Sequence, residues 1–159
     1  MNQHRFVVDV NVGRLAKWLR VLGYDTLFPK HADDNDLVRI AIREGRVLVT
    51  RDAGFSLRRA VRQGQMRVVQ ILDQDLDDQL RQLVREMALE PTNGFSRCVV
   101  CNEPLHSVAK EKVADRLPPY VYQNHSDFME CPQCCRLYWR GTHWSAMCAQ
   151  IEQVYREVS

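Results

Sequence analysis

The chain has 159 residues, of which 45% are hydrophobic and 26% are charged, and its formal net charge is +2. This length suffices for one good hydrophobic core, or for one core and a small stapled module. The composition excludes a disordered or collagen-like chain, and the net charge is too small to indicate a polyanionic partner by itself. Because the N-terminal apolar run is too short for a signal peptide and no segment is long enough to span a membrane, we expect a cytoplasmic protein.

The first 90 residues alternate short apolar runs with segments of helical periodicity. The apolar runs predict strands at residues 6–8, 26–28, 47–50 and 67–72. The periodic segments predict helices at residues 15–22, 34–44, 55–62 and 80–87. Strands that alternate with helices over short connections indicate an α/β fold, with a parallel sheet covered by helices on both faces.

Two of the predicted strands end next to an aspartate. Asp9 directly follows the first strand, and Arg51 and Asp52 follow the third. In the commonest orders of such sheets the first and third strands are neighbours, and active sites lie at the carboxyl ends of the strands. We therefore expect Asp9 and Asp52 to face each other at this edge of the sheet.

The segment Asp33-Asp34-Asn35-Asp36 adds further acids at the start of the second predicted helix. Several carboxylates at one edge repel one another unless divalent cations bind there, and oxygen ligands suit Mg²⁺ or Mn²⁺. Such ions support phosphodiester hydrolysis by activating a water molecule and stabilising the leaving oxyanion. A purely structural interpretation makes Asp34 the N-cap of the helix and Asp36 a favourable charge in its first turn. For Asp9 and Asp52 we expect no comparable structural need for an acid.

Basic residues lie close to these acids in the sequence. Arg14, Lys17 and Arg20 share the polar side of the first predicted helix, and Arg51 precedes Asp52. Arginine presents a fixed fork of donors that suits phosphate, although a solvated helix surface explains many arginines equally well. Arg14, Lys17 and Arg51 are therefore our candidates for binding phosphate groups.

A cluster of turn-forming residues divides the chain. Residues 91–94 (PTNG) separate the alternating block from a tail in which helical periodicity weakens and Pro118-Pro119 interrupts the pattern. The predicted boundary lies near residue 92, which gives one domain over residues 1–92 and a second module over residues 93–159.

The second module contains two CxxC motifs, Cys98–Cys101 and Cys131–Cys134, separated by the 29 residues 102–130. Each CxxC turn directs two thiolates at one ion, and two such turns complete a closed tetrahedral site typical of structural zinc. His106, His125 and His143 are alternative ligands. Two cysteines are left over: Cys135 either competes for the metal or points away, and Cys148 is most simply a small buried hydrophobic residue.

Aromatic and basic residues are interleaved after the last CxxC motif. The aromatic members are Tyr138, Trp139 and Trp144, and the basic members are Arg136, Arg140 and His143. Such a mixture suits stacking on nucleobases and pairing with phosphates. An equally strong alternative is that the aromatic side chains pack the second module onto the first domain.

Several of these segments together resemble one known family. They are residues 6–9 (FVVD), 13–25 (GRLAKWLRVLGYD), 33–34 (DD), 47–52 (VLVTRD), 95–102 (FSRCVVCN) and 131–144 (CPQCCRLYWRGTHW). They resemble the PIN-like RNase family named after the carboxy-terminal domain of the Mut-seven exonuclease, which carries a C-terminal zinc ribbon. The resemblance implies a PIN-like three-layer domain with a parallel sheet, followed by a small zinc ribbon. It also implies a metal-dependent ribonuclease whose acids are Asp9, Asp34 and Asp52, with Asp36 beside them.

The chain departs from the family pattern at two positions. PIN domains often have Glu as the second acid, whereas this chain offers only Asp34 and Asp36, so the choice between these two stays open. Cys135 stands where Gly usually follows the last cysteine of the ribbon. Neither departure removes the expected partners, which are RNA, structural Zn²⁺ and catalytic Mg²⁺ or Mn²⁺. The oligomeric state stays open, a homodimer included.

A second function is kept beside the enzyme: a catalytically inactive module that binds RNA or a protein on the same fold. Two other folds with acids at strand ends fit less well. A phosphoacceptor receiver needs a second acid beside Asp9 and a lysine after a later strand, and the chain has Val10-Asn11 and no such lysine. An aspartyl phosphatase needs an Asp two residues after its nucleophile, where Asn11 stands.

Overall fold

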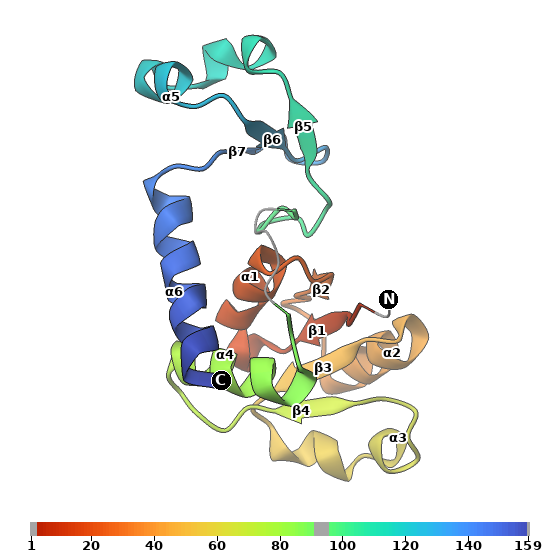
Figure 1. The fold of residues 1–159 in the computed structure, drawn as a ribbon. Helices are drawn as coiled ribbons and strands as arrows, with labels where there is room; N and C mark the ends of the chain where they lie inside the picture. Colours follow the sequence, from red (N-terminus) through yellow and green to blue (C-terminus); the bar gives the residue numbers. More distant parts are fainter. Residues whose placement is uncertain (1–2, 91–95, 159) are drawn as a thin grey trace.

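The structure, a computed structural model, describes residues 3–90 and 96–158 (Figure 1). Its N-terminal part contains a four-stranded parallel sheet in the order β2-β1-β3-β4. The strands are β1 (Phe6–Val8), β2 (Thr26–Leu27), β3 (Val47–Thr50) and β4 (Val68–Gln70). The first and third strands are neighbours, which confirms the predicted arrangement at the centre of the sheet.

Helices follow each strand. They are α1 (Arg14–Val21), α2 (Asp34–Glu44), α3 (Arg59–Arg62) and α4 (Leu76–Met87), and two 3₁₀ turns, η1 (Val10–Val12) and η2 (Ala53–Leu57), follow β1 and β3. The single helix predicted over residues 55–62 is therefore wrong in part. Arg58 adopts an extended backbone (φ −63°, ψ 143°) between η2 and α3, so the segment is divided into two short turns.

The two faces of the sheet bury different side chains. Phe6 and Val8 pack in a cluster with the buried faces of α1 and α4, whereas Val7 and Leu48 pack with α2 and with Phe55 of η2. Alternate residues of a strand point to opposite faces, so both faces of β1 lie in apolar surroundings. This confirms the predicted α/β fold with helices on both faces of a parallel sheet.

The C-terminal part begins with a small antiparallel sheet in the order β5-β6-β7. Its strands are β5 (His106–Val108), β6 (Phe128–Glu130) and β7 (Leu137–Tyr138). Between β5 and β6 lie η3 (Lys110–Lys112), η4 (Ala114–Arg116) and α5 (Pro119–Asn124). Strands this short bury little apolar surface and need another source of stability.

The last helix, α6 (Thr142–Val158), runs from this small sheet back to α4 (Figure 1). Met147 and Val154 are buried in the same cluster as residues of β1 and α4, and Gln150 Nε2 donates to Asp77 Oδ1 at 2.7 Å. The C-terminal helix therefore completes the core of the N-terminal part. The predicted boundary near residue 92 falls outside the described residues and stays a prediction. Among the described residues, no helix is both long and apolar enough to cross a bilayer.

Polar contacts hold the first CxxC segment against β2. The Arg20 guanidinium donates to Thr26 O at 3.0 Å and to Val99 O at 2.9 Å, and Asn102 Oδ1 accepts from Thr26 N at 2.9 Å. The expectation that Arg20 shares the exposed polar face of α1 is therefore wrong. Only 9% of Arg20 is exposed, because the buried backbone carbonyls provide it with acceptors.

Asp25 lies at the same junction and links it to a buried arginine. Its Oδ1 accepts from Arg46 Nη1 at 2.9 Å and from Asn102 Nδ2 at 2.7 Å. Burial alone would raise the pKa of the Asp25 carboxyl, but the hydrogen bonds from Arg46 and Asn102 outweigh it and lower this pKa. The charged form of Asp25 therefore stabilises the fold.

We expect Asp25→Asn to lower the free energy of unfolding at pH 7 by about 1 kcal/mol, because two hydrogen bonds to a charged group become neutral ones. The folded-state pKa is lowered, so this stabilisation is complete above the unfolded value of about 3.9 and is lost as the pH falls through the folded value. Urea unfolding between pH 2.5 and pH 7 measures it. The difference between the variant and the wild type should shrink in acid, whereas the exposed Asp127→Asn should behave like the wild type throughout.

Candidate metal centre and carboxylate site

Asp9 and Asp52 lie on either side of Thr50 at the carboxyl edge of the sheet. The Thr50 hydroxyl donates to Asp9 Oδ2 at 2.8 Å, and Thr50 Oγ1 accepts from the backbone N–H of Asp52 at 3.1 Å. Thr50 itself is fully buried, whereas Asp9 is half-buried and Asp52 is exposed. The pairing of β1 with β3 thus brings two residues 43 positions apart to one hydroxyl group.

Both aspartates also cap a 3₁₀ turn. Asp9 Oδ1 accepts from Val10 N at 2.8 Å, and Asp52 Oδ1 accepts from Gly54 N at 2.8 Å. The expectation that these acids have no structural role is therefore wrong, since each satisfies a backbone donor at the start of η1 or η2. Within the described part of the chain, Asp52 Oδ2 has no hydrogen-bond partner, and Asp52 as a residue is exposed.

The acids at the start of α2 divide into two kinds. Asp33, and not Asp34, is the N-cap, and it forms a capping box with Asp36. The hydrogen bond from the Asp33 backbone, followed by that from Arg39, lowers the pKa of the Asp36 carboxyl. Asp34 is exposed and lies 3.8 Å from Arg58 Nη2. Asp34 is therefore the less engaged of the two candidates for the second acid.

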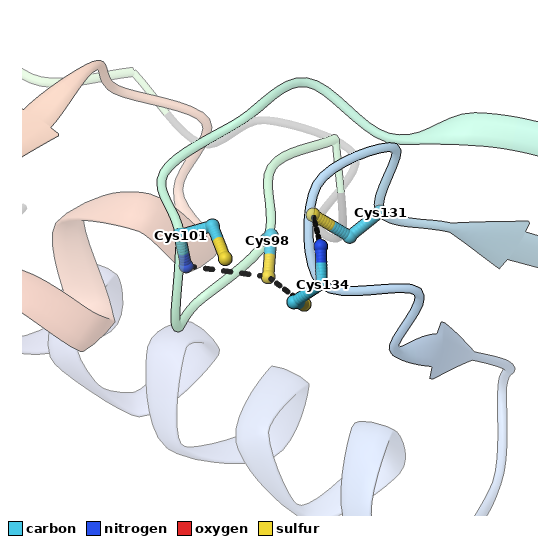
Figure 2. Close-up of side chains that lie close together, drawn as sticks. All are labelled: Cys98, Cys101, Cys131 and Cys134. Carbon is cyan, nitrogen blue, oxygen red and sulfur yellow. Dashed lines mark hydrogen bonds between the residues drawn. The ribbon is translucent and has the colours of Figure 1, made fainter.

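The four CxxC cysteines come together in space (Figure 2). Their sulfur atoms all lie within 4.8 Å of one another, and the Sγ atoms of Cys98 and Cys134 are 3.7 Å apart. A zinc ion with Zn–S bonds of about 2.3 Å in a tetrahedron separates its sulfur ligands by about 3.8 Å. The sulfur positions therefore fit zinc. Among the described residues, this is the one group of three or more His, Cys, Asp or Glu side chains that is this compact.

The two CxxC motifs have the same local geometry. In the first, Cys101 N lies 3.4 Å from Cys98 Sγ, and in the second Cys134 N lies 3.5 Å from Cys131 Sγ. Backbone N–H groups aimed at sulfur stabilise the thiolate that binds metal. The shared geometry of these two separate turns indicates that both present their sulfur atoms in the same way.

A left-handed residue follows each motif. Asn102 has φ +69° and Cys135 has φ +63°, and their N–H groups donate to the carbonyls of Cys98 and Cys131 at 2.9 and 3.0 Å. Glycine and asparagine tolerate this conformation better than other residues, so Asn102 suits its position and a glycine would suit the position of Cys135. Cys135 is exposed and does not belong to the compact group of sulfur atoms.

The CxxC thiols differ in acidity. Burial would raise the pKa of Cys98, but hydrogen bonds from Tyr138 and from the backbone of Cys101 and Val100 lower it to about 7. A hydrogen bond with Cys134, followed by burial, raises the pKa of Cys101 to about 12. One thiolate thus forms readily and discourages a second, until a cation neutralises the group.

The other candidate zinc ligands lie apart from this group. His106 is exposed on β5, His125 follows α5, and His143 is exposed at the start of α6. None of them is in the compact group of the described residues, and neither is the half-buried Cys148. The four CxxC cysteines are therefore the residues that could hold zinc.

A comparison with protein-family models matches residues 4–151 to the Mut7-C RNAse domain. The chain belongs to the Mut7-C RNAse domain family. Comparisons with curated proteins and with solved structures found no match. The family is named for ribonuclease activity, so membership in it indicates a ribonuclease-type function and an RNA substrate.

The Mut7-C match includes all of the predicted acids and all four CxxC cysteines. It also includes the three predicted phosphate-binding residues. Arg14 and Lys17 are exposed one turn apart on α1, and the half-buried Arg51 donates its backbone N–H to Asn11 Oδ1 at 3.1 Å. Side chains three residues apart lie on one face of a helix, so Arg14 and Lys17 form a basic strip that begins five residues after Asp9.

The aromatic and basic stretch of this Mut7-C protein packs largely within the ribbon. The Tyr138 hydroxyl lies 3.1 Å from Cys98 Sγ, and the ring of Trp139 lies 6.2 Å from that of Phe128. Arg140 lies over the ring of Trp144 at 5.5 Å. Tyr138 is thus explained by packing beside the CxxC cysteines, and Trp139 by packing on Phe128, rather than by contact with the N-terminal sheet.

Proposed function

We propose that this protein is a ribonuclease that uses Mg²⁺ or Mn²⁺ to hydrolyse RNA phosphodiester bonds. In this proposal Asp9 and Asp52 bind the metal, and the second acid of the family pattern is Asp34 or Asp36. The observation that carries it is the position of Asp9 and Asp52 at the carboxyl ends of two adjacent parallel strands, where the Thr50 hydroxyl donates to the Asp9 carboxylate and accepts from the Asp52 backbone N–H. Open α/β folds place their active sites at this edge.

The donor set suits a hard divalent cation. Mg²⁺ commonly binds through one or two carboxylates and completes its shell with waters and substrate phosphates. Asp52 is exposed, and the Thr50 hydroxyl fixes the orientation of the Asp9 carboxylate. When bound, such an ion supplies an activated water and neutralises the charge on the leaving oxygen.

The remaining residues position the substrate. Arg14 and Lys17 are exposed beside the carboxylate edge and suit the phosphates that flank the scissile bond. The contact of Asn11 with the Arg51 backbone holds the loop that carries Asp52. The zinc is structural in this proposal, because four cysteines close its shell. We place the protein in the cytoplasm, where such thiols stay reduced.

The capping roles of Asp9 and Asp52 favour a second candidate, an inactive module that binds RNA or a protein. An acid that satisfies a backbone donor has a reason to be present without catalysis. A purified protein that binds RNA with steep salt dependence, but cleaves none with any divalent ion, would support this alternative.

The test is a cleavage assay on mixed RNA after dialysis against metal-free buffer, a treatment mild enough to leave zinc in a four-thiolate site. We expect cleavage on addition of Mn²⁺ or Mg²⁺ and none without them. Asp34→Asn should lower the rate more than Asp36→Asn, because Asp36 is engaged with Asp33 and Arg39. The opposite order would assign the second acid to Asp36, and equal cleavage with and without divalent ions would contradict the proposal.

A further inference from the structure

A pocket of about 870 Å³ lies where the zinc ribbon meets α1 and α6. It is built from segments far apart in the sequence: Lys17 comes from α1, Val99 from the first CxxC motif, Tyr120 from α5 and Trp144 from α6. Its volume falls in the range of ligand-binding pockets. The acids of the proposed nuclease site do not line it, so this is a separate site.

The charged side chains that line the pocket are all basic. They are Lys17, Arg136 and Arg140, all of them exposed, and the lining includes no Asp or Glu. The whole chain has a net charge of only +2, so this uniform sign is a local feature. Basic side chains around a concave surface attract an anionic ligand.

The same lining presents aromatic rings. Tyr120 is 72% exposed on α5, and contact with Phe128 fixes the ring of Trp139. The guanidinium of Arg140 lies 5.5 Å from the ring centre of Trp144. Aromatic and guanidinium planes stack on unpaired bases, whereas the cations pair with the phosphates between those bases. A purely anionic ligand, such as an acidic peptide, would pair with the cations but would not stack on the exposed ring of Tyr120.

The pocket is connected to the carboxylate edge by α1. Lys17 lines the pocket, Arg14 lies one turn earlier, and η1 joins this helix to Asp9. Arg14 and Lys17 are three residues apart, which corresponds to a rise of about 4.5 Å along the helix, so the basic strip spans a distance that a single RNA strand bridges with a few nucleotides. The path leads from the proposed scissile site to the aromatic pocket.

From these observations we infer that the pocket binds unpaired nucleotides of a single-stranded RNA, adjacent to the nucleotide that lies at the carboxylates. This inference rests on the proposed function for the identity of the substrate, but not for the binding itself. It assigns Tyr120 to base stacking, and Lys17 and Arg140 to phosphate contacts.

The test measures binding of a fluorescently labelled single-stranded RNA of mixed sequence to the full zinc-loaded chain that carries Asp52→Asn, so that cleavage does not interfere. We expect Tyr120→Ala to weaken binding about fivefold to 100-fold and to leave the salt dependence unchanged. Arg140→Ala should also weaken binding and should lower the slope of log affinity against log salt by about 0.7. The matched control is Arg156→Ala, an exposed arginine near the far end of α6, which should change neither quantity.

Both pocket substitutions remove exposed side chains, and circular dichroism with zinc analysis checks that each variant is folded. A duplex of the same sequence should bind more weakly, because its bases are not free to stack. Unchanged affinity in both Tyr120→Ala and Arg140→Ala would overturn the inference, even if the protein cleaves RNA. If these variants lose RNA binding while the Asp52→Asn protein still cleaves RNA, the result supports the inferred pocket and contradicts the proposed catalytic site.

Discussion

Replacing Asp9 or Asp52 by asparagine is expected to lower metal-dependent RNA cleavage by about 10²–10⁴-fold, while the protein stays folded. Each substitution removes one negative charge from a site where a divalent cation is proposed to bind. The cleavage rate should therefore fall, and the Mn²⁺ concentration needed for half-maximal rate should rise. A titration of cleavage rate against Mn²⁺ measures both effects.

We choose asparagine as the replacement because its side chain can keep the capping hydrogen bonds. Asp52 Oδ1 accepts from Gly54 N, and Asn Oδ1 can accept the same bond. Asparagine is as good an N-cap as aspartate, so thermal unfolding should change little. In the Asp9 variant the new amide can donate to Thr50 Oγ1 in place of the hydrogen bond that Asp9 Oδ2 accepts.

Asp75→Asn is the matched control for this experiment. Asp75 caps α4 and accepts from the backbone N–H of Asp77 at 3.0 Å, which is the same structural role without a contact to Thr50. We expect this variant to cleave RNA at nearly the wild-type rate. Cleavage that persists in both Asp9→Asn and Asp52→Asn, or that falls equally in Asp75→Asn, would remove the support for a catalytic role.

The sequence predicts the sheet well because its signals are local. The two central strands, β1 and β3, are short apolar runs buried on both faces, so the run itself marks the strand and its last residue marks the carboxyl edge. The order of the strands follows from the commonest topology of such sheets, which places β1 beside β3. The zinc-type site can be predicted from the sequence equally well, because a CxxC turn positions two sulfur atoms without contacts from the rest of the fold.

The sequence does not predict features that depend on tertiary contacts. Arg20 is spaced like an exposed residue of α1, but it is buried against carbonyls of β2 and of the distant first CxxC segment. Asp33 and Asp34 are equally good caps by composition, and the choice depends on where the backbone turns into α2. The return of α6 to α4 requires the apolar side chains of two helices more than 50 residues apart in the chain to find each other.

Loss of zinc is expected to unfold the ribbon and to leave the parallel sheet in place. The ribbon strands contain three, three and two residues, and the ribbon buries only small clusters around Cys98 and around Phe128. In small zinc modules the metal supplies about 10–16 kcal/mol, which is folding free energy. The four-stranded sheet has separate apolar clusters on both faces and needs no metal to form them.

Cys131→Ser tests this expectation, because Cys131 is fully buried and belongs to the compact sulfur group. The wild type should carry about one zinc per chain by elemental analysis, and the variant should carry none. Hydrogen exchange should then become fast in β5, β6 and β7 and stay slow in β1 and β3. The matched control is Cys135→Gly, which removes a neighbouring thiol at a left-handed position that suits glycine and should keep the zinc.

The contacts at β2 make the effect of zinc loss reach further than the ribbon. Without an ordered first CxxC segment, Arg20 loses the carbonyl of Val99, and Asp25 loses the amide of Asn102. A buried guanidinium without its acceptors costs free energy, so α1 and β2 should also exchange faster than β3. Because α1 carries Arg14 and Lys17, the zinc-free protein should bind RNA more weakly even where its carboxylates are intact. Equal protection of β2 with and without zinc would show that the ribbon and the sheet are independent.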